Sequence, residues 1–189
     1  MKYFSIDIET TGIDPEKHQI LEVGAIFEDT DKQLSFDEIP KFHRILSPPS
    51  DIIGTPFALN MNQRILKILS SDKLCTENRV TTYDSFIKQF INWIKEVNNG
   101  NNKINCAGKN FAGFDKQFLE KNFPLFKSEI KISNRVLDPA ILYAKLSDDS
   151  LPNTETCVKR AGIELNNFHY ALDDSWTVIQ LLRKKYHLL

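Results

Sequence analysis

Residues 7–12 read DIETTG, and they follow the apolar-rich run YFSI at residues 3–6. This run predicts a first β-strand, on which Asp7 and Glu9 are two positions apart and point to the same face. Two like charges side by side on a central strand repel each other and are poorly solvated, which raises the cost of folding. A divalent cation between the carboxylates removes that cost. The stretch therefore predicts half of a metal site.

Length and composition narrow the class of protein. The chain has 189 residues and a formal net charge of −1, which suits one domain spanning residues 1–189. This charge excludes a general polycation mechanism for holding nucleic acid, although a nuclease can bring positive charge as bound metal. The three cysteines are widely spaced without a CxxC pair, so we expect reduced thiols in a cytoplasmic protein. We expect neither a signal peptide nor a membrane segment.

The pattern of apolar residues predicts strands early in the chain and helices later. Strands are expected at residues 2–8, 20–28, 41–46, 103–107 and 131–137. Helices are expected at residues 56–69, 83–97, 111–122, 153–161 and 170–186, with a further helix capped by Asp138 and Pro139. This order predicts an α/β fold with a mixed five-stranded sheet flanked by helices. Its three early strands are antiparallel and the later strands are parallel.

One acid lies where an amphipathic helix should be apolar. In the predicted helix at 111–122, Asp115 shares an aromatic stripe with Phe111, Phe118 and Leu119. An acid at the edge of the helix, reaching solvent, would give the same pattern. We favour a site residue, because carboxylates are rarely buried without a partner.

The last predicted helix offers two adjacent acids. Asp173 lies on a polar face, where solvation explains it, whereas Asp174 shares a partly buried stripe with Ala171 and Val178. Asp174 is therefore the favoured site acid, and Asp173 is the less favoured alternative. His169 lies five residues before Asp174 at the start of this helix. Histidine side chains ordinarily titrate near neutrality, which suits a general base.

Three motifs together resemble the DnaQ-like, or DEDDh, 3′→5′ exonucleases, which have an RNase H-like fold. The motifs are DIETTG at 7–12, NFAGFDKQFL at 110–119 and HYALDD at 169–174. The family spaces its histidine and its metal-binding aspartate by five residues, so its register also selects Asp174. The segment 47–82 is longer than a minimal proofreading domain needs, and we interpret it as a family-variable insertion.

The resemblance implies a two-metal hydrolysis. Asp7, Glu9, Asp115 and Asp174 would hold two divalent cations, Mg²⁺ or Mn²⁺, which carboxylate ligands suit. His169 would take the proton from the attacking water, and hydrolysis of the terminal phosphodiester would release a nucleoside 5′-monophosphate.

The resemblance also implies contacts with the 3′-terminal nucleotide. Residues expected to bind substrate lie on three segments: Thr10, Thr11 and Gly12; Asn110; and Phe57, Leu59 and Asn60. Phe57 and Leu59 fit base stacking and the start of an ordinary amphipathic helix equally well. Asp138 is left out of the site, because its place before a proline is explained as a helix cap.

The predicted function is a stand-alone metal-dependent exonuclease that acts on the 3′ ends of single-stranded DNA or RNA. DNA is slightly favoured, because the motifs lie nearer the proofreading type than the oligoribonuclease type. One alternative is a proofreading subunit with a polymerase or another replication or repair protein as partner. Another is an inactive nucleic-acid-binding module of the same fold. The presence of all four acids and of His169 favours an active enzyme.

Overall fold

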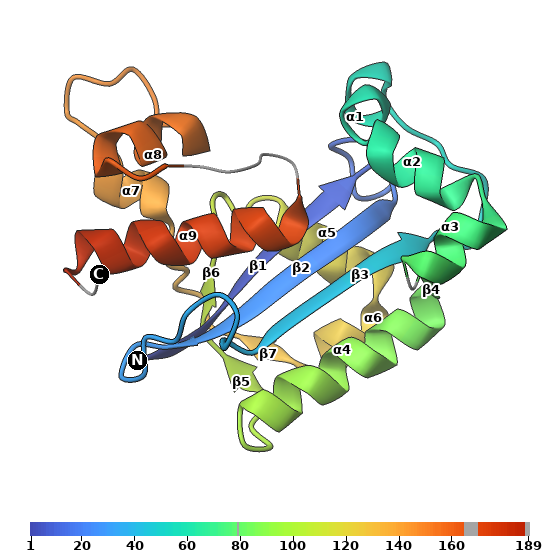
Figure 1. Ribbon diagram of the computed structural model, residues 1–189, viewed down its shortest axis with the longest axis horizontal. Coiled ribbons are helices and arrows are strands. Elements are labelled where there is room, and N and C mark those ends of the chain that lie inside the picture. Colours follow the sequence, from blue (N-terminus) through green and yellow to red (C-terminus); the bar gives the residue numbers. More distant parts are fainter. Residues whose placement is uncertain (79, 165–169, 188–189) are drawn as a thin grey trace.

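The computed structural model describes residues 1–78, 80–164 and 170–187. Five strands form the main sheet: β1 (Lys2–Thr10), β2 (Ile20–Asp29), β3 (Lys41–Ser47), β4 (Thr81–Thr82) and β6 (Cys106–Ala107). Their order is β4-β3-β2-β1-β6 (Figure 1). β2 is antiparallel to both β1 and β3, whereas β4 is parallel to β3 and β6 is parallel to β1. The predicted mixed five-stranded sheet is therefore confirmed.

The strand predicted at 131–137 takes a different place from the one expected. Within this range only Lys131–Ile132 forms a strand (β7), and it pairs with β5 (Lys103–Ile104) in a separate two-stranded sheet. Leu137 adds a single parallel bridge to Ala107 of β6. The fifth strand of the main sheet is instead β4, whose two residues are too few to show a pattern.

Nine helices in the described part of the chain surround the sheets (Figure 1). They are α1 (Pro56–Met61), α2 (Gln63–Leu69), α3 (Asp72–Glu77), α4 (Tyr83–Val97), α5 (Asp115–Asn122), α6 (Pro124–Glu129), α7 (Pro139–Tyr143), α8 (Thr154–Ala161) and α9 (Ala171–Lys185). The predicted helix 83–97 is confirmed at both ends. The predicted helix 56–69 is broken at Asn62, and α3 and α6 were not predicted. Among the described residues, no helix has the length and apolar character to span a membrane.

Two predicted helix ends are confirmed by their caps. The Asp138 side chain accepts a hydrogen bond from the Ala140 N–H at the start of α7. Gly162 ends α8 with a φ of 65°, a left-handed conformation that glycine adopts without steric cost.

Alternation along β1 divides its side chains between two cores. Phe4, Ile6 and Ile8 join a large aromatic cluster with α4 and α5. Tyr3 packs on the opposite face, in a cluster that includes Ile179 of α9. Asp7 and Glu9 have the parity of Tyr3, so the strand directs both carboxylates to the side that α9 covers.

The first turn of α9 lies directly on β2 at Gly24. A Cβ atom at Gly24 would lie 2.3 Å from the Ala171 carbonyl carbon and from the Leu172 nitrogen. The Ser175 hydroxyl donates a hydrogen bond to the Gly24 carbonyl at 3.0 Å. A side chain at position 24 would therefore push the helix off the sheet. This close approach holds the first turn of α9, which carries Asp174, against the sheet that carries Asp7 and Glu9.

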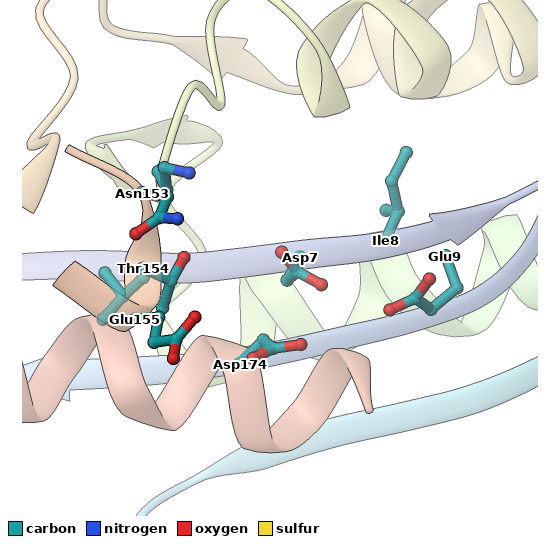
Figure 2. A pocket seen from close by; sticks show the side chains of 9 residues that line it. Asp7, Ile8, Glu9, Asn153, Thr154, Glu155 and Asp174 are labelled. Carbon is teal, nitrogen blue, oxygen red and sulfur yellow. The ribbon is translucent and has the colours of Figure 1, made fainter. Parts of the chain in front are cut away.

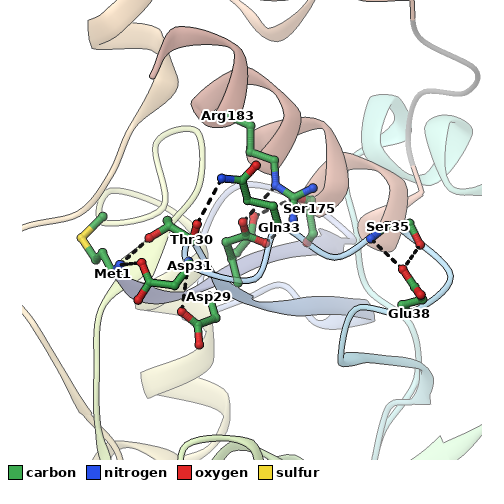
Figure 3. A network of polar contacts seen from close by, with 11 residues as sticks. Met1, Asp29, Thr30, Asp31, Gln33, Ser35, Glu38, Ser175 and Arg183 are labelled. Atoms are coloured by element: carbon green, nitrogen blue, oxygen red, sulfur yellow. Dashed lines mark hydrogen bonds and ion pairs between the residues drawn. The ribbon is translucent and has the colours of Figure 1, made fainter. Parts of the chain in front are cut away.

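The far end of α9 is fixed by a buried ion pair. Arg183 donates hydrogen bonds from Nε and Nη2 to the two carboxylate oxygens of Glu28, at 2.9 and 2.7 Å. Figure 3 shows Arg183 reaching from α9 toward the polar turn that contains Thr30 and Gln33. Both ends of α9 are thus attached to β2, one by backbone contact and one by charge.

Candidate active site

Asp7 and Glu9 on β1 face Asp174 on α9 (Figure 2). Each residue offers a carboxylate oxygen, and these three oxygens lie within 4.8 Å of one another. Strand alternation supplies the first two acids, and the first turn of α9 supplies the third. The structure therefore brings together three of the four acids that the sequence predicted as metal ligands.

The three acids line a cavity of about 410 Å³. Ile8 of β1 and Val178 of α9 also line the cavity, together with Lys109 after β6. Asn153, Thr154 and Glu155 at the start of α8 complete its lining (Figure 2). This volume is typical of a site for a small ligand or for one unit of a longer one. Among the described residues that line the cavity, Lys109 is the only one with a positive charge.

Asp115, the fourth predicted acid, lies outside the group of three. Its carboxylate oxygen Oδ1 accepts a hydrogen bond from the Ile8 N–H at 3.1 Å, and the residue is 4% exposed. The predicted burial among aromatic residues is confirmed, although α5 begins at Asp115 and Phe111 precedes the helix. Because Ile8 separates the two acids of β1, this hydrogen bond ties Asp115 to the part of the strand that carries the site.

Burial and mutual repulsion raise the pKa values of these acids. Burial is the main cause for Asp7, whose pKa lies well above its ordinary value, and the charges of Asp115, Asp174 and Glu9 add to it. Burial also raises the pKa of Asp115 to about 8. The pKa of Glu9 is raised to about 7 by burial and by the charges of Glu22 and Asp174. A bound cation would compensate this excess of negative charge.

Asp174 and Asp173 occupy different surroundings although they are adjacent in sequence. Asp174 lines the cavity and belongs to the group of three acids, and Asp173 does neither. The Asp173 carbonyl accepts a hydrogen bond from the Thr177 hydroxyl, one turn further along α9. The geometry therefore favours Asp174, in agreement with the stripe argument.

His169, the predicted general base, lies in the segment 165–169, outside the described residues. Its neighbour Tyr170 immediately precedes α9 and is 40% exposed. The role of His169 stays a prediction.

The turn after β1 is held by internal hydrogen bonds. The Thr10 hydroxyl donates to the Gly12 carbonyl at 2.7 Å, and the Thr11 hydroxyl donates to the Ile53 carbonyl at 2.6 Å. The Thr11 N–H donates to Gln19 O, and its carbonyl accepts from the Thr55 N–H. Both threonine side chains are buried and stabilise the turn, and contact of residues 10–12 with a terminal nucleotide stays a prediction.

The other residues predicted to bind substrate lie outside the lining of the cavity. Phe57, Leu59 and Asn60 belong to α1, which buries none of its residues, and Phe57 is 76% exposed. Phe57 is therefore not a core residue of an ordinary amphipathic helix. Asn110 is exposed with a φ of 55°, and its N–H donates to Asp138 Oδ2 at 2.9 Å.

Sequence reasoning missed several residues that surround the acids. Lys109 lies one residue before the second motif, so a motif that began at residue 109 instead of 110 would have included it. Glu22 on β2 pairs in register with Glu9, and an acid inside an apolar strand was a usable signal. The start of α8 carried no signal, because packing between segments distant in sequence brings Asn153, Thr154 and Glu155 to the cavity.

Comparison with known proteins defines the class. The model of the exonuclease family RNase_T matches residues 4–182, and the chain belongs to this family. The predicted membership of an exonuclease family is thereby confirmed.

Particular relatives and solved structures extend this result. The nuclease domain of 3′hExo, a DEDDh family member bound to rAMP, matches with a TM-score of 0.69 and 17% identity over 98% of this chain and 92% of that one. E. coli Exonuclease I in complex with a dT13 oligonucleotide matches with a TM-score of 0.66 and 18% identity over 97% of this chain and 41% of that one. The chain is 26% identical over 186 residues to a PolC-type DNA polymerase III of Clostridium perfringens. That match covers 96% of this chain but spans only 11% of the relative.

Proposed function

We propose that this chain is a metal-dependent 3′→5′ exonuclease that releases nucleoside 5′-monophosphates from single-stranded ends. The observation that carries the proposal is the set of three carboxylates from Asp7, Glu9 and Asp174 on the wall of one cavity. Three acids this close raise the free energy of the folded chain unless a cation balances them. A site of this kind is expected in an enzyme that handles phosphate through bound metal.

The donor set fits hard divalent cations. Asp7, Glu9 and Asp174 would hold Mg²⁺ or Mn²⁺, since both ions prefer carboxylate oxygen ligands. Asp115, buried against the Ile8 N–H, would complete the four-acid set that the family resemblance implies. The two bound ions would supply an activated water and charge stabilisation at the leaving oxygen.

The chain's own residues have separate tasks in this proposal. His169 takes the proton of the attacking water as general base. Lys109 places a positive charge on the cavity wall and attracts a substrate phosphate to a cavity whose other charged lining residues are acids. Burial of Thr10 and Thr11 keeps the turn after β1 fixed beside the acids.

The sugar of the substrate, ribose in RNA or deoxyribose in DNA, is a separate question. 3′hExo is bound to rAMP and Exonuclease I to dT13, so relatives in fold hold ribonucleotide and deoxyribonucleotide ligands. We propose DNA as the better substrate, because the motifs and the PolC-type relative both point to DNA metabolism. That relative also favours a second candidate function, a proofreading exonuclease that works with a DNA polymerase.

The test uses single-stranded DNA and RNA of one sequence, labelled at either end, with Mg²⁺ or Mn²⁺. We expect a 3′ label to appear at once as mononucleotide, and a 5′ label to give a ladder of shortening products. Release that persists in EDTA, or in the Asp7→Ala variant, would overturn the metal assignment. Asp173→Asn is the matched control for Asp174→Asn, and only the latter should abolish cleavage.

The general base and the proofreading alternative need separate measurements. His169→Ala should lower turnover about 10²–10⁴-fold with metal binding retained, and an unchanged rate would remove His169 from the mechanism. A proofreading enzyme should remove a mismatched 3′ nucleotide from a primer–template faster when a DNA polymerase is present than when it is absent. Equal rates with and without the polymerase would favour the stand-alone exonuclease.

A further inference from the structure

Glu22 is a buried acid that the proposed mechanism leaves without a role. It lies on β2 directly opposite Glu9 of β1 and is 1% exposed. Arg64 Nη2 contacts both of its carboxylate oxygens, at 2.8 and 2.7 Å, and His43 Nε2 lies 2.7 Å from Oε1. Glu22 therefore differs from the neighbouring site acids, because its charge is balanced within the protein.

The Glu22 carboxylate also caps α9, the helix that carries Asp174. The Ala171 N–H at the first position of α9 donates to Glu22 Oε2 at 3.3 Å, and Tyr170 makes no side-chain cap of its own. An acid at this end of a helix satisfies a free N–H and interacts favourably with the helix dipole. Glu22 thus connects β2 to the turn that presents Asp174.

Arg64 brings the segment 47–82 into the same arrangement. Its guanidinium lies 4.2 Å above the centre of the Tyr170 ring while it pairs with Glu22. Asn62, two residues earlier, donates from Nδ2 to the Thr10 carbonyl at 3.1 Å at the end of β1. The start of α2 therefore contacts the two elements, β1 and α9, whose acids form the site.

We propose that Arg64 is a positioning residue that acts through Glu22. It holds the first turn of α9 against β2, and so it fixes Asp174 opposite Asp7 and Glu9. This role rests on the proposed nuclease function, and it gives the segment 47–82 a part in catalysis. Neighbours that orient metal ligands typically contribute about 10–100-fold to activity or affinity.

The test compares Arg64→Ala with Arg160→Ala. Arg160 is a matched control, since it also pairs with an acid, Asp148, and has a similarly exposed side chain at 23% against 29% for Arg64. At saturating Mn²⁺, we expect Arg64→Ala to lower kcat about 10–100-fold with little change in KM. Arg160→Ala should leave both constants near wild type. Arg64→Lys should restore part of kcat, because lysine keeps the charge but loses the planar fork and the ring contact.

Hydrogen exchange of the peptide 170–175 gives a readout that needs no activity. Arg64→Ala should increase exchange in this peptide more than in α4, whereas Arg160→Ala should leave the peptide protected. Wild-type kcat in Arg64→Ala, or exchange that rises uniformly through the protein, would overturn the positioning role. If the wild-type protein cleaves no nucleic acid, the proposed function fails. Hydrogen exchange of the peptide 170–175, compared between Arg64→Ala and the wild-type protein with and without Mn²⁺, then still decides whether Arg64 holds the first turn of α9.

Discussion

The two ends of α9 bury charge against the same sheet in opposite ways. At one end, Arg183 and Glu28 are 5% and 0% exposed and pair at 2.7 Å. At the other end, Asp174 meets Asp7 and Glu9, three carboxylates with oxygens within 4.8 Å of one another. The first arrangement pairs opposite charges, whereas the second gathers like charges.

This difference separates a structural ion pair from a candidate functional site. A compensated pair fixes the helix, and nothing in it requires a ligand. A set of acids held close together raises the free energy of the folded protein by mutual repulsion, and proteins retain such sets where binding or catalysis uses them. Glu22 stands between the two cases, because it is next to the acids but pairs with the positive charge of Arg64.

The largest effect of a single substitution is expected at the end where Arg183 pairs with Glu28. Arg183→Met leaves Glu28 buried without its partner, and we expect the free energy of unfolding to fall by about 3–5 kcal/mol. Urea unfolding in the presence of EDTA measures this change. The double variant Glu28→Gln with Arg183→Met is the control, and it should recover a large part of the loss. A single variant as stable as wild type would show that the pair does not hold α9.

The acidic end should respond to pH when metal is absent. The folded-state pKa values of Glu9 and Asp115, about 7 and about 8, lie above those of the unfolded chain, because burial disfavours the ionised form. The folded protein therefore holds more protons than the unfolded chain between about pH 4 and pH 8. Their stabilising contribution is complete below the unfolded pKa values and is lost as pH rises through the folded ones. Stability measured in EDTA should fall across this range.

Metal should reverse this loss. A divalent ion at 100 times its dissociation constant adds about 2.7 kcal/mol to the free energy of unfolding. The gain should be larger at pH 8 than at pH 6, because metal binding requires ionised carboxylates. Thermal unfolding with and without Mn²⁺ at both pH values measures it. Equal stability with and without Mn²⁺ at pH 8 would contradict a metal site at Asp7, Glu9 and Asp174.

Local sequence patterns were sufficient to predict the features that depend on a single strand or helix. The alternation in β1 predicted that Asp7 and Glu9 share a face, and the periodicity of residues 83–97 predicted α4. The stripe on α9 selected Asp174 over Asp173, and the structure places Asp174 in the cavity. Each of these features depends on spacing within one segment, which a sequence displays directly.

Features that depend on contacts between distant segments could not be predicted in this way. The break at Asn62 is stabilised by its hydrogen bond to the Thr10 carbonyl, 52 residues away in sequence. The two-residue strand β4 exists because it pairs with the end of β3. The walls formed by Lys109 and by the start of α8 likewise arise from long-range packing. Tertiary contacts override local propensity at these places.

The smallest effect is expected from a single change within the acidic group, and its sign is the opposite of the Arg183 effect. Asp7→Asn removes one of the repelling charges and keeps the shape of the side chain. In EDTA at pH 8 we expect the free energy of unfolding to rise by about 0.5–2 kcal/mol, a typical gain when a strained functional site is relieved. The gain should vanish near pH 4, where the acids of the folded protein are protonated. Asp173→Asn, which alters an acid outside the group, should change stability by less than about 0.5 kcal/mol. Because Asp7→Asn also removes a proposed metal ligand, Mn²⁺ should stabilise this variant less than the wild-type protein. A loss of stability in EDTA at pH 8 would mean that Asp7 stabilises the fold, and the two ends of α9 would then no longer differ in kind.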